Sequence, residues 1–213
     1  KMELEQLVMQ LEPTLIVVVA YGMILPKKIT DTFFCLNIHA SLLPKYRGAS
    51  PIQTALLNNE KDTGITLMKI NEKMDTGDIL GQAKIDIDET DNYGSLHNKL
   101  ANLGAELFHE FMEEQYVPTK FDLKKQNEGL ATYCKKINKE DLLISIKTDP
   151  KLLLRKIKAF SPSPCAYIIH NDKRIKIVDA TVSDGKLNIL LLKPEGKKVM
   201  SYKDYCLANA SIN

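Results

Sequence analysis

Asn37 and His39 stand two residues apart at the end of a short apolar run, FCLNIH. Side chains of a strand alternate between its two faces, so these two are expected to point into the same space. Ligands of open α/β sheets bind outside the carboxyl ends of the strands. An amide and an imidazole supply two N–H donors, which suit an oxygen that gains negative charge in a transition state. Taken alone, however, an N-x-H pattern is more often a satisfied core histidine beside an asparagine turn.

A loop of unusual composition, SLLPKYRG, follows directly. Ser41, Pro44 and Gly48 predict a rigid loop whose backbone can lie close to a flat ligand. Leu42 and Leu43 would then form a hydrophobic pocket wall. The alternative is an ordinary strand-to-helix connection with a leucine plug, and the loop by itself does not decide between the two. Its two cations offer charges for the anionic tail of a ligand.

A second loop, MDTGD, places Asp75 and Asp78 around a Thr-Gly pair. A carboxylate there can accept a proton from an amine or keep His39 protonated. Taken alone, the motif is more often an Asx turn. The three motifs together fit the transfer of a one-carbon acyl group from a flat donor to an amine, with Asn37 and His39 holding the tetrahedral oxyanion.

The elements that must position these residues alternate between helix and strand. Helical spacing of leucines predicts a helix over residues 3–11, and TLIVVVA predicts a strand buried on both faces of a parallel sheet. FCLNIH is a second strand, PIQTALLNN a helix, and ITLMKI and AKIDID are two half-buried strands. Ser95 is expected to cap a long helix whose apolar stripe comprises Leu96, Leu100, Leu103, Leu107, Phe108 and Phe111. This order of elements predicts an α/β fold.

The charge balance divides the chain. Residues 1–118 hold ten Lys and Arg against seventeen Asp and Glu, whereas residues 119–213 hold nineteen against ten. We therefore predict a first domain over 1–118, a linker over 119–137, and a second domain over 138–213 that faces a polyanion. The second domain is expected to begin with a helix over PKLLLRKIKAF, to continue with the strands PCAYIIH, RIKIVDATVS and KLNILLLKP, and to end with a short helix begun by Ser201.

Several classes of protein are disfavoured. No apolar run approaches the roughly 20 residues that span a bilayer, and no secretion signal opens the chain, so we predict a cytoplasmic protein without a membrane segment. The four cysteines, at positions 35, 134, 165 and 206, are widely separated and form no C-x-x-C pair. Reduced thiols are therefore expected, and we predict no metal site and no disulfide framework.

NIHASLLPKYRGASPIQ, followed by DTGITLMKINEKMDTGDIL, resembles the 10-formyltetrahydrofolate-dependent formyltransferases, and the likeness extends to VVVAYGMILP, KAFSPSP and LLKPEGKKVMS. The resemblance implies that Asn37, His39 and Asp75 are the catalytic triad and that Ser41, Leu42, Leu43 and Pro44 bind folate. It also implies a Rossmann-like catalytic domain and a C-terminal OB-like β-barrel that helps to hold tRNA. The implied reaction takes the formyl group of 10-formyltetrahydrofolate to the α-amino group of initiator methionyl-tRNA, for translation initiation.

The chain also departs from the family pattern. The family's opening strand–helix–strand unit, with its G-T-P type motif and inserted loop, is absent, so we expect the Rossmann-like domain to be partial. The chain has no Trp, and SPSP stands where relatives often carry P-W-P. Two alternatives stay open: a sugar-nucleotide N-formyltransferase that uses the same donor, and an inactive fragment that binds RNA through its basic half.

Overall fold

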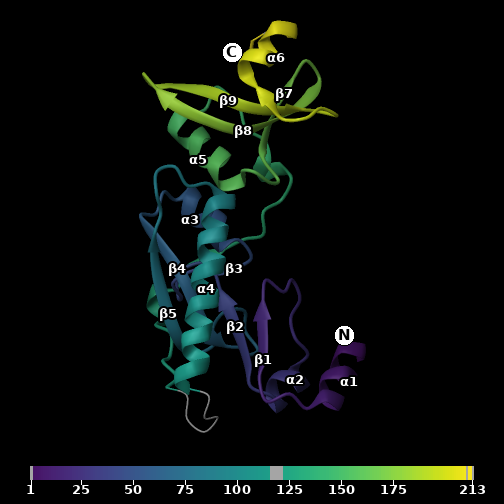
Figure 1. Cartoon of the computed structure of the whole chain (residues 1–213), viewed down its shortest axis with the longest axis vertical. Coiled ribbons are helices and arrows are strands. Elements are labelled where there is room, and N and C mark those ends of the chain that lie inside the picture. The colour runs from purple at the N-terminus through teal and green to yellow at the C-terminus, as the bar shows by residue number, and fades with distance from the viewer. Residues whose placement is uncertain (1, 116–121, 210, 213) are drawn as a thin grey trace. The chain divides into compact units, whose positions relative to one another are not determined.

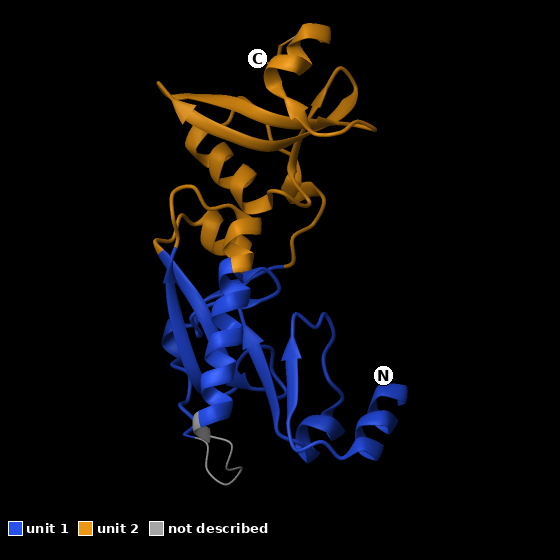
Figure 2. Ribbon diagram, viewed as in Figure 1, with its two compact units in different colours: residues 1–51, 62–86, 99–135 blue, residues 52–61, 87–98, 136–213 orange. Residues whose placement is uncertain are grey.

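The computed structural model describes residues 2–115, 122–209 and 211–212, and the chain divides into two compact units (Figures 1 and 2). Unit 1 comprises residues 1–51, 62–86 and 99–135, and unit 2 comprises residues 52–61, 87–98 and 136–213. The predicted domain boundary at 118/119 lies outside the described residues, so that boundary stays a prediction.

A mixed four-stranded sheet forms the centre of unit 1, in the order β1-β2-β4-β5. β1 (Ile16–Val19) runs parallel to β2 (Cys35–His39), whereas β4 (Asp62–Lys69) and β5 (Ile79–Asp86) extend the sheet in antiparallel fashion. Unit 1 also contains α1 (Met2–Leu11), α2 (Lys27–Thr32) and most of α4 (Tyr93–Gln115), whose residues 93–98 belong to unit 2. Helix α3 (Pro51–Leu57) belongs to unit 2 except for Pro51. The predicted α/β class is confirmed.

Two burial predictions for the strands are wrong. β1 is not buried on both faces, since Val17 is 38% and Val19 60% exposed. β1 is an edge strand that pairs with β2, and one face of it is uncovered in the described structure. β4 is not half-buried, because residues 63–68 are all buried between β2 and β5, with α4 residues against Ile65. Only β5 shows the expected alternation.

The start of α4 also differs from the prediction. The helix begins at Tyr93, and Asn92 Oδ1 accepts a hydrogen bond from the Ser95 backbone N at 3.0 Å. Ser95 Oγ reciprocates by accepting from the Asn92 backbone N at 3.0 Å. Asn92 is therefore the capping residue and Ser95 its partner three residues on, as in a capping box. The apolar stripe is confirmed at its ends, where Leu96, Leu100 and Phe111 are buried.

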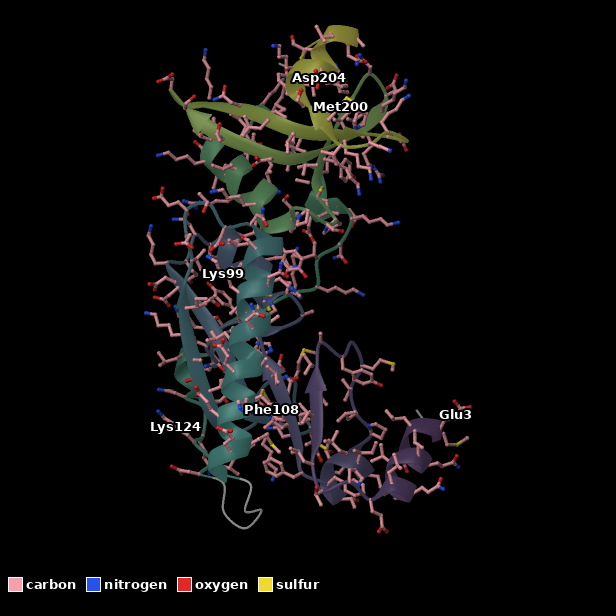
Figure 3. All side chains as sticks on the ribbon, viewed as in Figure 1. Glu3, Lys99, Phe108, Lys124, Met200 and Asp204 are labelled. Atoms are coloured by element: carbon pink, nitrogen blue, oxygen red, sulfur yellow. The ribbon has the colours of Figure 1, made fainter. Side chains whose placement is uncertain are left out.

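After α4 the chain returns along unit 1. Lys124, labelled in Figure 3, pairs in antiparallel fashion with Ile79 of β5. η1 (Glu128–Leu130) follows, and then β6 (Tyr133–Cys134) pairs with β3 (Arg47–Gly48) as a parallel two-stranded sheet. Lys124, Tyr133 and Cys134 thus pair with strands of the same unit.

Unit 2 holds a small antiparallel sheet in the order β10-β9-β8-β7, which confirms the expected strand-rich second half. Its elements follow η2 (Glu140–Leu142) and are α5 (Pro150–Phe160), β7 (Ala166–His170), β8 (Lys173–Ser183), β9 (Lys186–Pro194), β10 (Met200–Ser201) and α6 (Tyr202–Ala208). Asp149 caps α5 by accepting from two backbone N–H groups. Ser201 caps α6 as predicted, accepting from the Asp204 backbone N at 3.1 Å; Asp204 is labelled in Figure 3.

Candidate active site

Strand β2 places Asn37 and His39 on one face of the unit 1 sheet. Ile38 between them points toward α4, where a Cβ added to Gly104 would lie 3.3 Å from Ile38 Cγ2. Asn37 and His39 therefore share the opposite face, as the two-residue period predicts. The Asn37 side chain is half-buried and has no hydrogen-bond partner within the described ranges.

The imidazole of His39 is fixed by two neighbours. Its side chain is only 7% exposed. Nε2 lies 3.0 Å from the Tyr46 carbonyl oxygen, which can only accept, so Nε2 carries a proton. Nδ1 lies 3.8 Å from Asp75 Oδ1. Nδ1 is therefore the ring nitrogen that faces the carboxylate of Asp75.

Asp75 is held by its backbone and by its second carboxylate oxygen. Oδ2 accepts a hydrogen bond of 2.8 Å from the Gly48 backbone N. The backbone of Asp75 is left-handed, with φ +54°, a conformation that a non-glycine residue keeps only when its surroundings enforce it. Gly77 is required two residues later, because a Cβ there would lie 1.7 Å from the Lys69 carbonyl oxygen. The MDTGD turn is thus packed tightly enough to aim Asp75 Oδ1 at His39.

The SLLP loop is fixed by one buried hydroxyl. Thr66 Oγ1 donates to the Ser41 carbonyl oxygen at 2.6 Å and accepts from the Leu43 backbone N at 3.0 Å. Gln82 Nε2 donates to the same hydroxyl and to the Leu43 carbonyl oxygen, each at 2.9 Å. The backbone of the loop is therefore anchored to β4 and β5 at both ends of the Ser41–Leu43 stretch.

The loop's side chains divide between core and surface. Leu43 is 3% exposed and packs with Met68 and Ile79. Leu42 is less buried and lies against Gly64, where a Cβ would be 2.5 Å from Leu42 Cδ2. Any ligand wall built by this loop therefore consists of Leu42, Pro44 and backbone rather than of Leu43.

Arg47, one of the two cations of the SLLPKYRG loop, is not available to bind the anionic tail of a ligand as its position suggested. Its side chain is 1% exposed and forms a two-bond pair with Glu128, at 2.9 Å from Nη1 and 2.7 Å from Nη2. Hydrogen bonding to Glu128 raises the pKa of the guanidinium, and the same contact lowers the pKa of the carboxyl. Nε and Nη2 also donate to Gln126 Oε1 at 3.0 and 2.8 Å. Arg47 thus joins the loop to the returning chain.

The structure therefore brings His39 and Asp75 together and places Asn37 on the same face as His39. Sequence reasoning missed Thr66, Gln82 and Gln126, which hold the two loops. Only their polarity within apolar or linker-like segments could have marked them. Within the described ranges no group of three or more His, Cys, Asp or Glu side chains could hold a metal ion. No helix there is both long and apolar enough to cross a bilayer.

The family model described as "Formyl transferase" matches residues 1–112, and "Formyl transferase, C-terminal domain" matches residues 136–187. Methionyl-tRNA formyltransferase of Thermodesulfovibrio yellowstonii is 39% identical over 226 residues, covering 95% of this chain and 72% of the relative. The enzyme of the same name from Methylococcus capsulatus is 38% identical over 233 residues, covering 98% and 75%. The chain belongs to the methionyl-tRNA formyltransferase family. The matched N-terminal region contains all three candidate catalytic residues.

Solved structures agree with this family at the level of the fold. The methionyl-tRNA formyltransferase from Clostridium thermocellum superposes with a TM-score of 0.69 at 23% identity, covering 89% of this chain and 81% of that one. HypX from Aquifex aeolicus, solved in complex with tetrahydrofolic acid, gives a TM-score of 0.77 at 17% identity, covering 96% of this chain and 40% of that one. The predicted combination of a formyltransferase domain and a C-terminal β domain is thereby confirmed. The C-terminal domain is a small antiparallel sheet, and the OB-like barrel implied for it stays a prediction.

Proposed function

We propose that the protein transfers the formyl group of 10-formyltetrahydrofolate to the α-amino group of initiator methionyl-tRNA, a reaction of translation initiation. The observation that carries the proposal is identity of 38–39% with methionyl-tRNA formyltransferases over nearly the whole chain. The family acts with folate-derived formyl donors, and a fold neighbour was solved with tetrahydrofolic acid. Because the acceptor is a charged tRNA, we also propose a cytoplasmic location.

The proposed chemistry uses Asn37 and His39 as donors to one oxygen. The amine attacks the formyl carbon, and the carbonyl oxygen becomes an oxyanion. The unpartnered Asn37 amide and the Nδ1–H of a protonated His39 are the donors available on this face. Preorganised donors of this kind contribute roughly 3–4 kcal/mol each to transition-state stabilisation. Collapse of the intermediate breaks the bond to the folate nitrogen, which leaves with a proton, while the amine loses one.

Asp75 is proposed to act mainly on His39. Its Oδ2 is occupied by the Gly48 amide, and Oδ1 faces Nδ1 at 3.8 Å. A carboxylate in this place can orient the imidazole that donates to the oxyanion. Proton removal from the attacking amine by Oδ1, directly or through water, is the second role that this geometry permits. Ser41, Leu42, Leu43 and Pro44 are proposed as the folate-binding loop, with Ser41 and Leu43 contributing through their anchored backbone.

The proposed tRNA surface is the basic second half of the chain, in the predicted division 1–118, 119–137 and 138–213. Exposed cations of unit 2 include Lys173, Arg174, Lys186, Lys193, Lys197 and Lys198. Phosphate contacts release counterions, so tRNA affinity should fall steeply as salt rises. Binding that stays unchanged between about 50 and 200 mM salt would remove this surface from the proposal.

The competing reading is a sugar-nucleotide N-formyltransferase. A 4-N formyltransferase from Francisella tularensis shares the fold with a TM-score of 0.69, but at 20% identity it supports the fold alone. The purified protein should therefore be offered methionyl-tRNA and an amino-sugar nucleotide separately, each with 10-formyltetrahydrofolate. Formylation of methionyl-tRNA that His39→Ala abolishes supports the proposal and eliminates an inactive RNA-binding fragment. Formylation of the sugar alone overturns the proposal.

A further inference from the structure

The segment that returns along unit 1 after α4 contacts the loop that carries Asp75. Gln126 Nε2 donates to the Asp75 carbonyl oxygen at 2.9 Å and to the Gly77 carbonyl oxygen at 2.7 Å. One side-chain amide therefore spans both ends of the Asp75–Gly77 turn. Its two N–H groups are fully used by these two acceptors.

The orientation of this amide is itself fixed. Gln126 Oε1 accepts from Arg47 Nε and Nη2 at 3.0 and 2.8 Å, so only Nε2 can face the turn. Arg47 is 1% exposed and is also held by Glu128. The side chain of Gln126 is thus locked by a buried cation on one side and by two carbonyl oxygens on the other.

The Asp75–Gly77 turn, to which Gln126 donates, has a backbone and a side chain that depend on support from their surroundings. Asp75 has a left-handed backbone, which costs of order 1–3 kcal/mol and persists only where the surrounding structure holds it. The orientation of the Asp75 carboxylate is restricted, because Oδ2 accepts from the Gly48 amide while Oδ1 faces His39. A small displacement of the turn would break this alignment.

We propose that Gln126 is a positioning residue that sets the carboxylate of Asp75 against His39 through its two hydrogen bonds to the Asp75–Gly77 turn. The proposal rests on the proposed function for its catalytic consequence but not for its geometry. It assigns a role in the active site to a segment whose sequence looks like a polar linker. Arg47 supports the same arrangement by fixing the amide of Gln126.

The sharpest variant is Gln126→Glu. A glutamate retains an oxygen acceptor for Arg47 but donates nothing to the turn, so it removes the two proposed bonds and places a carboxylate oxygen against the two carbonyl oxygens of the turn. Gln126→Met removes them without adding a charge and serves if the glutamate variant does not fold. Gln10→Glu is the matched control, because Gln10 is exposed on α1.

The first readout is independent of activity and uses the Gly48 amide. Its N–H donates to Asp75 Oδ2, whereas the neighbouring amides of residues 47 and 49 donate to the carbonyl oxygens of Thr132 and Cys134. Exchange of the Gly48 amide with solvent, measured by NMR, should accelerate roughly tenfold or more in Gln126→Glu, as it should in Asp75→Ala. It should not change in Gln10→Glu. An unchanged Gly48 exchange rate in both Gln126 variants would overturn the proposal, whatever the enzyme's activity.

The second readout is steady-state formylation of methionyl-tRNA. Misplacing a catalytic group by about 1 Å costs on the order of 100-fold in rate, so kcat should fall roughly 10- to 100-fold with KM for tRNA little changed. In the double variant with Asp75→Asn, kcat should fall no further than in Asp75→Asn alone, because Gln126 acts through Asp75. Multiplying losses would contradict the proposal. If the wild-type protein is inactive but Gly48 exchange is accelerated in the Gln126 variants, the proposed function is refuted and the positioning role stands.

Discussion

Thr66→Val tests how the SLLP loop is anchored, because it replaces a hydroxyl by a methyl group of nearly the same size. Thr66 is fully buried, and the substitution leaves the Leu43 N–H without its acceptor and the Ser41 carbonyl oxygen without this donor. Gln82 Nε2 also loses an acceptor, but Gln82 is exposed and water can replace it. Each buried group left unsatisfied costs about 1–3 kcal/mol, and the added methyl group offsets about 0.8 kcal/mol. The expected loss in the free energy of unfolding is therefore about 3 kcal/mol.

Urea unfolding checks this value, and two further measurements check the anchoring of the loop. Urea unfolding should show a lower midpoint with an unchanged slope. Hydrogen exchange at the Leu43 amide should accelerate, and the KM for the folate donor should rise roughly tenfold if this loop binds it. A loss confined to tRNA affinity would contradict the proposed assignment of the loop.

Thr63→Val is the matched control on the same strand. Thr63 is 4% exposed, and its hydroxyl has no hydrogen-bond partner in the part of the chain that the structure describes. The same substitution there should change the free energy of unfolding by no more than about 0.5 kcal/mol. If Thr66→Val is no more destabilising than Thr63→Val, the reasoning about the buried hydroxyl is refuted.

Two further predictions concern single residues of unit 1. Burial raises the pKa of Cys35 to about 11, so the unfolded chain loses the thiol proton first as pH rises. The free energy of unfolding should therefore fall above about pH 9, by up to about 1.4 kcal/mol per pH unit until pH 11. Urea unfolding of Cys35→Ala should lack this pH-dependent loss. Equal pH dependence of the two proteins would refute the assignment. Gly77→Ala forces a Cβ against the Lys69 carbonyl oxygen and should lower kcat roughly 100-fold. Gly81→Ala should not, because its Cβ would lie 3.7 Å from Leu107 Cδ1, an ordinary contact. Equal formylation rates for the two variants would contradict the tight packing of the turn.

The sequence was sufficient where local rules decide the structure. The two-residue period placed Asn37 and His39 on one face, and strand, turn and capping signals located most elements of unit 2. It was insufficient where distant segments meet. Nothing local indicates whether other elements cover both faces of TLIVVVA, and Val19 is exposed because one face of β1 is uncovered in the described structure. Likewise, the loop sequence suggested that Arg47 binds an anionic ligand. Its actual partner, Glu128, lies 81 residues away in the chain and could not be recognised locally.

The loops of the site show the same limit. The motif MDTGD indicated a carboxylate at a turn, but its direction depends on hydrogen bonds from Gly48 and Gln126 that no sequence period encodes. Similarly, the role of Thr66 is invisible in an apolar strand, since a threonine there is also an ordinary strand former.

The most direct test of the account is a single formylation assay of wild-type protein and His39→Ala with methionyl-tRNA and 10-formyltetrahydrofolate. Removing a preorganised donor to the oxyanion should lower kcat by on the order of 100- to 1,000-fold while methionyl-tRNA still binds. Formylation that proceeds equally well without the His39 imidazole would contradict the account of this site.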